Sequence, residues 1–199
     1  MTQKTEFACK NCKRKLEYYK SDCREFVCKG VYFDALIFSY KYQNIIRSLL
    51  LSFKFSNKSY LYSLLAQELK SRIKDFCVSK CIKIDYIISV PISYQRYLER
   101  GYNQSFLLAK AVSKHIDVPL IRFCLIKIKH NKRQSELNHS LRVANTQGVY
   151  TITIKSIIKN KTILLIDDIY TTGATINECS RLLKEAGAKC VIAGVCAKA

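Results

Sequence analysis

One stretch near the carboxyl end of the chain combines two acidic side chains with a short Thr/Gly turn. Residues 162–166 are mostly apolar and predict a buried parallel strand, and Asp167 and Asp168 follow them directly. A turn comes next, made of Tyr170, Thr171, Thr172, Gly173, Ala174 and Thr175. Carboxylates accept hydrogen bonds from sugar hydroxyls, and the unpaired N–H groups at the start of a helix bind phosphate. The pattern therefore predicts a site for a sugar phosphate.

The residues after this turn predict the helix that a phosphate site needs. Ile176, Cys179, Leu182 and Leu183 share one helical face, and Gly187 follows them as a C-cap. Ligands of open α/β sheets bind at the carboxyl ends of the strands, which is where the turn would lie. Two carboxylates would repel a bare phosphate, so we expect them to bind hydroxyls or a bridging divalent cation.

Other interpretations of this stretch predict different signatures. A Walker B strand would require a Gly-x-x-x-x-Gly-Lys-[Ser/Thr] loop, but no Gly in the chain is followed by Lys. A dinucleotide-binding fold would require Gly-x-Gly-x-x-Gly, which is also absent. An ordinary strand–loop–helix with solvated aspartates stays as the alternative.

Residues 163–175 resemble the ribose-phosphate-binding motif of type I phosphoribosyltransferases. That family binds 5-phosphoribosyl pyrophosphate (PRPP) together with Mg²⁺. The resemblance implies that Asp167 and Asp168 hold the ribose 2′- and 3′-hydroxyls. It also implies that the turn up to Thr175 wraps the 5′-phosphate.

A cysteine-rich segment precedes the rest of the chain. Two short pairs, Cys9 with Cys12 and Cys23 with Cys28, have a spacing typical of a structural zinc site with four cysteine ligands. A segment of this size cannot bury a core of its own, so zinc would supply its folding free energy. The alternative is four free thiols. We place the domain boundary near Gly30, with a zinc-binding module over 1–30 and a second domain over 31–199.

Composition limits the class of protein. The chain has 199 residues, ten cysteines and a formal net charge of +19. The first residues lack a signal peptide's apolar region, and no run approaches the roughly 18 apolar residues of a membrane span. We therefore expect a cytoplasmic protein with reduced thiols and no membrane insertion. The charge favours a polyanion such as nucleic acid, although compositional bias would produce the same excess of lysine.

The second domain alternates strand and helix patterns. Strands are expected at 31–38, 86–90, 120–128, 148–154, 162–166 and 191–196. Helices are expected at 42–53, 60–76, 103–115 and after residue 175. This order predicts an α/β fold, with a mostly parallel twisted sheet flanked by helices.

Two polar loops are expected beside the site. Residues 93–103 follow a strand and include Arg96, Arg100 and Asn103, with Gln104 next, so arginine forks could bind pyrophosphate. Asn103 is also placed to cap the following helix. Residues 129–145 form a long polar segment, either a lid over the ligand or a surface excursion.

Taken in order, these motifs resemble the ComF family of phosphoribosyltransferase-like competence proteins. The cysteine pairs, the sequence Arg-Gly-Tyr-Asn-Gln ending at Gln104, and the Asp-Asp-x-x-Thr-Thr-Gly-Ala-Thr turn carry the resemblance. The family usually has Cys-x-x-Cys at the second pair, and it often has Phe where Tyr102 stands. The resemblance implies a role in natural transformation, handling incoming single-stranded DNA in the cytoplasm, and partnership with a competence DNA helicase or translocase.

Three functions stay open. In the first, the protein binds PRPP and single-stranded DNA, and its nucleic-acid contacts are Lys54, Arg96, Tyr102, Lys132 and Arg133. In the second, it is a metabolic phosphoribosyltransferase that transfers phosphoribosyl to a base or amine, with Arg100 stabilising the leaving pyrophosphate. In the third, PRPP or a nucleotide is a regulatory ligand and nothing is catalysed.

Overall fold

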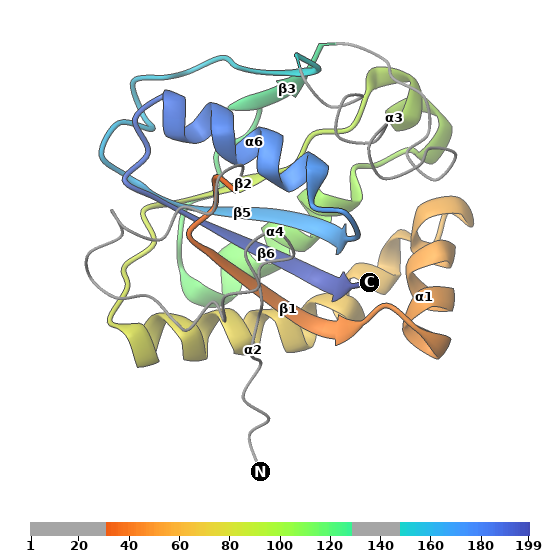
Figure 1. Cartoon of the computed structure of the whole chain (residues 1–199). Helices are drawn as coiled ribbons and strands as arrows, with labels where there is room; N and C mark the ends of the chain where they lie inside the picture. Colours follow the sequence, from red (N-terminus) through yellow and green to blue (C-terminus); the bar gives the residue numbers. More distant parts are fainter. Residues whose placement is uncertain (1–30, 129–147) are drawn as a thin grey trace.

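The computed structural model describes residues 31–128 and 148–199, and Figure 1 shows their arrangement. The helices are α1 Asn44–Phe55, the short 3₁₀ helix η1 Ser59–Leu61, α2 Tyr62–Lys80, α3 Tyr94–Arg100, α4 Gln104–Ile116 and α6 Ala174–Glu185. The strands are β1 Ala35–Lys41, β2 Tyr86–Ser89, β3 Leu125–Lys127, β4 Tyr150–Ile152, β5 Thr162–Tyr170 and β6 Cys190–Lys198.

Four strands form a parallel sheet in the order β1-β6-β5-β2. The two central strands, β5 and β6, pair along their whole length, from Thr162 opposite Cys190 to Tyr170 opposite Lys198. Helices α2 and α4 lie on one face of this sheet and α6 lies on the other (Figure 1). The mostly parallel sheet flanked by helices that the sequence predicts is confirmed.

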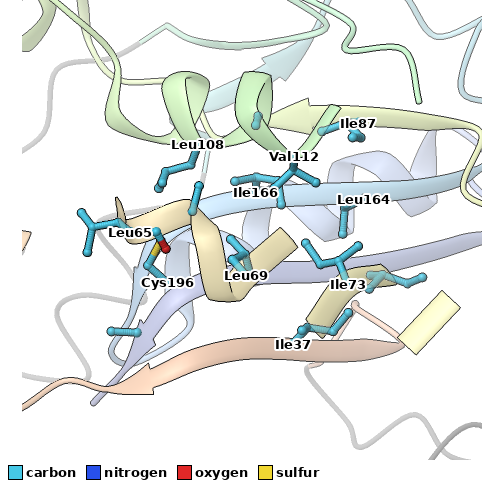
Figure 2. Packing of buried hydrophobic residues seen from close by; sticks show 14 of the residues in the cluster. Ile37, Leu65, Leu69, Ile73, Ile87, Leu108, Val112, Leu164, Ile166 and Cys196 are labelled. Carbon is cyan, nitrogen blue, oxygen red and sulfur yellow. The ribbon is translucent and has the colours of Figure 1, made fainter. Parts of the chain in front are cut away.

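Strand β5 is buried on both faces because its residues alternate between two hydrophobic cores. Leu164 and Ile166 pack with residues of α2 and α4, among them Leu69 and Leu108 (Figure 2). Ile163, next to Leu164, belongs to the other core, which α6 covers. Burying one such side chain stabilises the fold by about 1.5–3 kcal/mol. The buried part of β5 therefore holds the residues near its carboxyl end in a defined position.

Several expected strands have different limits in the structure, such as β4, which is expected over 148–154 and covers only Tyr150–Ile152. The segment expected as one strand over 120–128 is interrupted at Phe123, whose φ is 59°. Before the break, Leu120 makes an isolated parallel bridge to Ile87. After the break, β3 pairs with β4 in an antiparallel arrangement. A left-handed residue cannot continue the pleat of a strand, which explains the break.

The first strand begins later than the expected range of 31–38. Asp34 precedes β1, and its carboxylate accepts a hydrogen bond of 2.7 Å from the N–H of Val191. Lys184 also pairs with Asp34, with 2.6 Å between Nζ and Oδ2. Ordinary strand pairing starts only beyond this side-chain contact, with Ala35 opposite Ile192.

The carboxyl ends of the parallel strands meet at one edge of the sheet, where ligands bind in folds of this class. Helices α1 and α3 lie beside this edge, and α6 begins there (Figure 1). Across residues 31–128 and 148–199, no helix has both the length and the apolar character to cross a bilayer.

Candidate functional site

The acidic pair lies inside β5 and not beyond its end. Asp167 is opposite Val195 of β6, and pairing continues to Tyr170 opposite Lys198. The expected end of this strand at residue 166 is therefore wrong, because β6 supplies a parallel partner further along. Consecutive strand residues point to opposite faces, so Asp167 and Asp168 meet different neighbours.

Asp168 forms an ion pair with a lysine from a distant helix. Its Oδ2 atom lies 2.9 Å from Nζ of Lys54, and the two side chains are 8% and 22% exposed, respectively. Lys54 lies in the last turn of α1. A buried carboxylate needs such a partner, since an unpaired charge in this position would be costly.

Asp167 accepts hydrogen bonds from two donors at one oxygen. The Ser105 hydroxyl lies 2.8 Å from Oδ1, and the N–H of Asp168 lies 2.9 Å from the same atom. Burial, followed by repulsion from Asp168, raises the pKa of Asp167 to about 7, against the opposing effects of Lys54 and Ser105. Near neutral pH this carboxyl is therefore able both to donate and to accept a hydrogen bond, which suits it to a hydroxyl group.

The turn between β5 and α6 depends on one glycine. Gly173 is the N-cap of α6 and has a φ of 77°, in the left-handed region. A Cβ atom at this position would lie 2.4 Å from the hydroxyl oxygen of Tyr170. Thr172 Oγ1 accepts a bond of 3.3 Å from the N–H of Ala174, and the N–H of Asn177 donates to the Gly173 carbonyl at 2.8 Å. The first turn of α6 thus begins at Ala174, shortly after the acidic pair in the chain.

Two residues that sequence reasoning did not assign to the site support this turn. Tyr150 of β4 is buried and shares a side-chain hydrogen bond with Thr175. Lys127 of β3 places its Nζ atom 5.6 Å from the centre of the Tyr150 ring. Burial and then the nearby Arg96 lower the pKa of Lys127 to about 8. The sequence carries no signal for this cluster, because only the β3–β4 pairing brings Lys127 opposite Tyr150.

The segment expected as a loop over 93–103 contains helix α3. Ser93 caps it, since its Oγ accepts a bond of 3.4 Å from the N–H of Arg96. Gly101, with a φ of 74°, ends it. The loop prediction is therefore wrong, although a serine cap and a terminal glycine were both present in the sequence as signals of a short helix.

Arg100 and Gln104 join α3 to α4 at the same edge. Arg100 Nη1 donates a bond of 3.1 Å to Gln104 Oε1, and its guanidinium carbon lies 5.1 Å from the centre of the Phe55 ring. The other amide atom of Gln104, Nε2, is buried and has no hydrogen-bond partner among the described residues. Asn103 accepts bonds from the N–H groups of Ser105 and Phe106, so its predicted role as the cap of α4 is confirmed.

The residues predicted to contact nucleic acid are found in several places. Lys54 pairs with Asp168. Tyr102 donates a bond of 2.6 Å to the Phe53 carbonyl, and the two rings stack with centroids 5.7 Å apart. Arg96 lies half-buried on α3. The half-buried Tyr102 thus supports α1, and contacts of these three residues with nucleic acid stay a prediction.

Several predicted residues lie outside the described ranges. These are the two cationic side chains Lys132 and Arg133, and the four predicted zinc ligands Cys9, Cys12, Cys23 and Cys28. Within 31–128 and 148–199, no group of three or more His, Cys, Asp or Glu side chains is arranged to hold a metal ion. The zinc module and the boundary at residue 30 therefore stay predictions.

Comparison with known proteins identifies the family. Residues 103–199, which include α4, β5 and α6, match the phosphoribosyl transferase domain. Competence protein ComFC of Streptococcus pneumoniae is 33% identical over 185 residues, covering 91% of this chain and 76% of that protein. Competence protein F of Haemophilus influenzae is 29% identical over 181 residues, covering 90% of this chain and 79% of that protein.

A further relative has a name that refers to DNA. The DNA utilization protein YhgH of Escherichia coli K12 is 27% identical over 139 residues, covering 69% of this chain and 60% of that protein. The match to the phosphoribosyl transferase domain includes the acidic pair and the glycine turn that follows it. The chain belongs to the ComF family of phosphoribosyltransferase-like competence proteins.

Proposed function

We propose that the connection between β5 and α6 binds PRPP. The observation that carries this proposal is the juxtaposition of two carboxylates, Asp167 and Asp168, with a helix N-terminus that follows a left-handed glycine. A ligand with both vicinal hydroxyls and a phosphate matches these two kinds of group. PRPP carries both.

The ribose half of the ligand would bind at the acidic pair. Ribose hydroxyls would donate to the oxygens of Asp167 and Asp168. Lys54 already pairs with Asp168 at 2.9 Å, so a hydroxyl would either share that carboxylate or displace the ammonium group. The pKa of about 7 for Asp167 makes hydroxyl binding at this residue sensitive to pH near neutrality.

The phosphate half would bind at the start of α6. The N–H groups of the first helical turn lie at the positive end of the helix dipole, which favours an anion. The turn adds three hydroxyl side chains, those of Thr171, Thr172 and Thr175. Gly173 keeps the backbone of the turn open to close approach by phosphate oxygens.

The pyrophosphate half would bind near α3 and α4. Arg96 and Arg100 supply positive charge, and the buried Nε2 atom of Gln104 is a donor that lacks an acceptor within the described part of the chain. Lys127 adds a further positive charge close to Arg96. A pyrophosphate oxygen is the kind of acceptor that these groups need.

We expect Mg²⁺ to enter together with PRPP. Asp167 Oδ1 already accepts two hydrogen bonds and Asp168 Oδ2 already pairs with Lys54, so few carboxylate oxygens remain. Mg²⁺ often takes one or two carboxylates and completes its shell with substrate phosphates and water, which fits this donor set. Such an ion would neutralise part of the pyrophosphate charge.

Structural zinc at the four N-terminal cysteines is a separate proposal that rests on their spacing.

We further propose that this PRPP-binding protein acts in natural transformation, handling single-stranded DNA in the cytoplasm together with a helicase or translocase of that process. The names of the relatives refer to competence and to DNA utilization. The formal charge of +19 favours a polyanionic partner. Phe55, Tyr60 and Tyr94 are 61%, 65% and 76% exposed, and such rings are suited to stacking on unpaired bases.

Calorimetry with Mg²⁺ and PRPP tests the binding site. We expect saturable, Mg²⁺-dependent binding that Asp168→Asn weakens by at least about tenfold, because the variant lacks a carboxylate for the ribose. Asp117→Asn, which changes an aspartate at the far end of α4, is the control and should bind normally. Absence of PRPP binding by the unaltered protein would contradict the proposal.

Two assays separate DNA handling from metabolic transfer. Binding to single-stranded DNA that falls with salt and persists in Asp168→Asn would support DNA handling. Pyrophosphate release from PRPP with a defined base or amine, abolished by Asp168→Asn, would support a metabolic phosphoribosyltransferase instead. In a transformable host that lacks its own family member, complementation by this chain should restore transformation.

A further inference from the structure

A pocket lies beside the acidic pair, between the end of α1 and the end of α3. Its lining residues come from two separate parts of the chain and are Lys54, Phe55, Asn57, Glu99 and Arg100. Lys54 also contacts Asp168, so one side chain separates the pocket from the carboxylate proposed to hold ribose. Anything bound in the pocket would therefore be close to the sugar.

The apolar part of the pocket is an exposed aromatic ring. Phe53 and Phe55 lie in the last turns of α1, but Phe53 is 0% exposed whereas Phe55 is 61% exposed. The guanidinium carbon of Arg100 lies 5.1 Å from the centre of the Phe55 ring, in a cation–π contact. The contact orients the ring while much of its surface stays open. Such a surface suits a flat aromatic ligand.

The polar part of the pocket favours an uncharged heterocycle over a phosphate group. Asn57 has an amide that both donates and accepts, and its φ of 51° places it in a left-handed turn just after α1. Glu99 contributes a negative charge that would repel a phosphate at this position. Lys54, whose charge is paired with Asp168, and Arg100, which lies over the Phe55 ring, add donors beside it. Mixed donors and acceptors beside a ring match the edge of a nucleobase.

We propose that this pocket binds a nucleobase stacked on Phe55, with its edge toward Asn57 and Glu99. The inference rests on the proposed function, because a nucleobase in this pocket would lie beside the proposed ribose site. The base belongs either to a free nucleotide or to an unpaired position of single-stranded DNA. Both sources present the same ring and the same edge.

Substitutions of Phe55 test the pocket, measured by fluorescence anisotropy with an oligothymidylate and with an abasic oligonucleotide of equal length. We expect Phe55→Leu to weaken oligothymidylate binding by about 5- to 150-fold and to leave abasic binding unchanged, because loss of one stacked base corresponds to roughly 1–3 kcal/mol. Phe55→Trp should keep the affinity. Phe123→Leu is the matched control, since Phe123 is 73% exposed and lies near Arg122 but does not line the pocket.

Calorimetry with thymidine monophosphate identifies the source of the base. Phe55-dependent binding of the mononucleotide indicates a free nucleotide, and Phe55-dependent binding of the oligonucleotide alone indicates DNA. Either result supports the pocket. Equal loss for base-bearing and abasic strands, or no effect of Phe55→Leu on any probe, overturns it. Affinity for Mg²⁺ and PRPP, measured on the same variants, should stay normal, so failure of the pocket is distinguishable from failure of the PRPP site.

Discussion

The two sides of the candidate site are built in different ways. The β5–α6 side is continuous in sequence, and its geometry is set by a buried strand and by a backbone turn at Gly173. The α1–α3 side is assembled from separate segments, and it consists of side chains such as Phe55 and Arg100 that meet only after folding. The first side therefore depends on backbone conformation, whereas the second depends on contacts between side chains.

This difference predicts how each side responds to mutation. A change in the β5–α6 turn alters several N–H groups at once, because they belong to one stretch of backbone. A change on the α1–α3 side removes one contact and leaves the others in place. If this contrast holds, a substitution in the turn has the largest effect on PRPP binding, and loss of one contact on the α1–α3 side has the smallest.

The largest effect is expected for Gly173→Ala. The substitution forces a φ of 77° on a residue with a Cβ atom and places that atom 2.4 Å from the Tyr170 hydroxyl oxygen. We expect PRPP affinity to fall by at least about 100-fold in calorimetry, because an alanine is strained at this φ and either the Tyr170 side chain or the turn must move. Gly148→Ala has a similar φ of 64° with nothing within 4 Å, so it isolates the backbone cost. Equal PRPP affinity in the two variants would show that the turn is not the phosphate site.

The next effect is expected for the Lys54–Asp168 ion pair, which links the two sides. Lys54→Met leaves the buried carboxylate of Asp168 without its cation. We expect the free energy of unfolding in urea to fall by roughly 1–3 kcal/mol, less than for a fully buried pair because Lys54 is partly exposed. A double-mutant cycle with Asp168→Asn should return a coupling energy of about 1 kcal/mol or more. Purely additive effects would mean that the contact does not stabilise the protein.

A smaller effect is expected from the titration of Asp167. Its pKa is raised to about 7 in the folded protein and is near 4 in the unfolded chain. At a pH between these two pKa values, the folded protein binds one more proton at Asp167 than the unfolded chain does. The contribution of Asp167 to the free energy of unfolding is therefore fully present below about pH 4 and is lost as the pH rises through about 7. The melting temperature of the unaltered protein should therefore fall relative to that of Asp167→Asn between pH 5 and pH 8. A pH-independent difference would contradict the raised pKa.

The smallest effect is expected for Tyr102→Phe, on the α1–α3 side. The variant removes the hydrogen bond of 2.6 Å to the Phe53 carbonyl but keeps the stacked rings. We expect a loss of about 0.5–1.5 kcal/mol in the free energy of unfolding. PRPP affinity should stay within about twofold, because the β5–α6 turn is untouched. A large loss of PRPP binding would show that the two sides are more strongly coupled than their contacts indicate.

The sequence predicted correctly those features that depend only on residues close together in the chain. The helical stripe that begins after residue 175 is found in α6. The C-cap of this helix is Ala186, and the predicted glycine, Gly187, comes one residue later with a φ of 90°, where its N–H donates to the Lys184 carbonyl at 2.9 Å. The cap at Asn103 is likewise a contact within three residues of sequence. Such features depend on neighbours along the chain.

The sequence-based prediction was wrong where a distant partner decides the length of a strand. The continuation of β5 past residue 166 depends on its pairing with β6. The break at Phe123 is a local backbone feature that the apolar pattern over 120–128 does not reveal. The missed helix α3 is an exception, because its cap at Ser93 was readable in the sequence.

The sequence by itself determined the class of fold, the order of the chemical groups and the presence of an acidic pair followed by a glycine turn. These follow from apolar periodicity and from residues that are consecutive in the chain. The tertiary structure alone decided that Lys54 neutralises Asp168, that Ser105 binds Asp167 and that Phe55 and Arg100 form a pocket beside them. The physical reason is that charge pairing and stacking act over a few ångströms in space, whatever the separation of the residues in sequence.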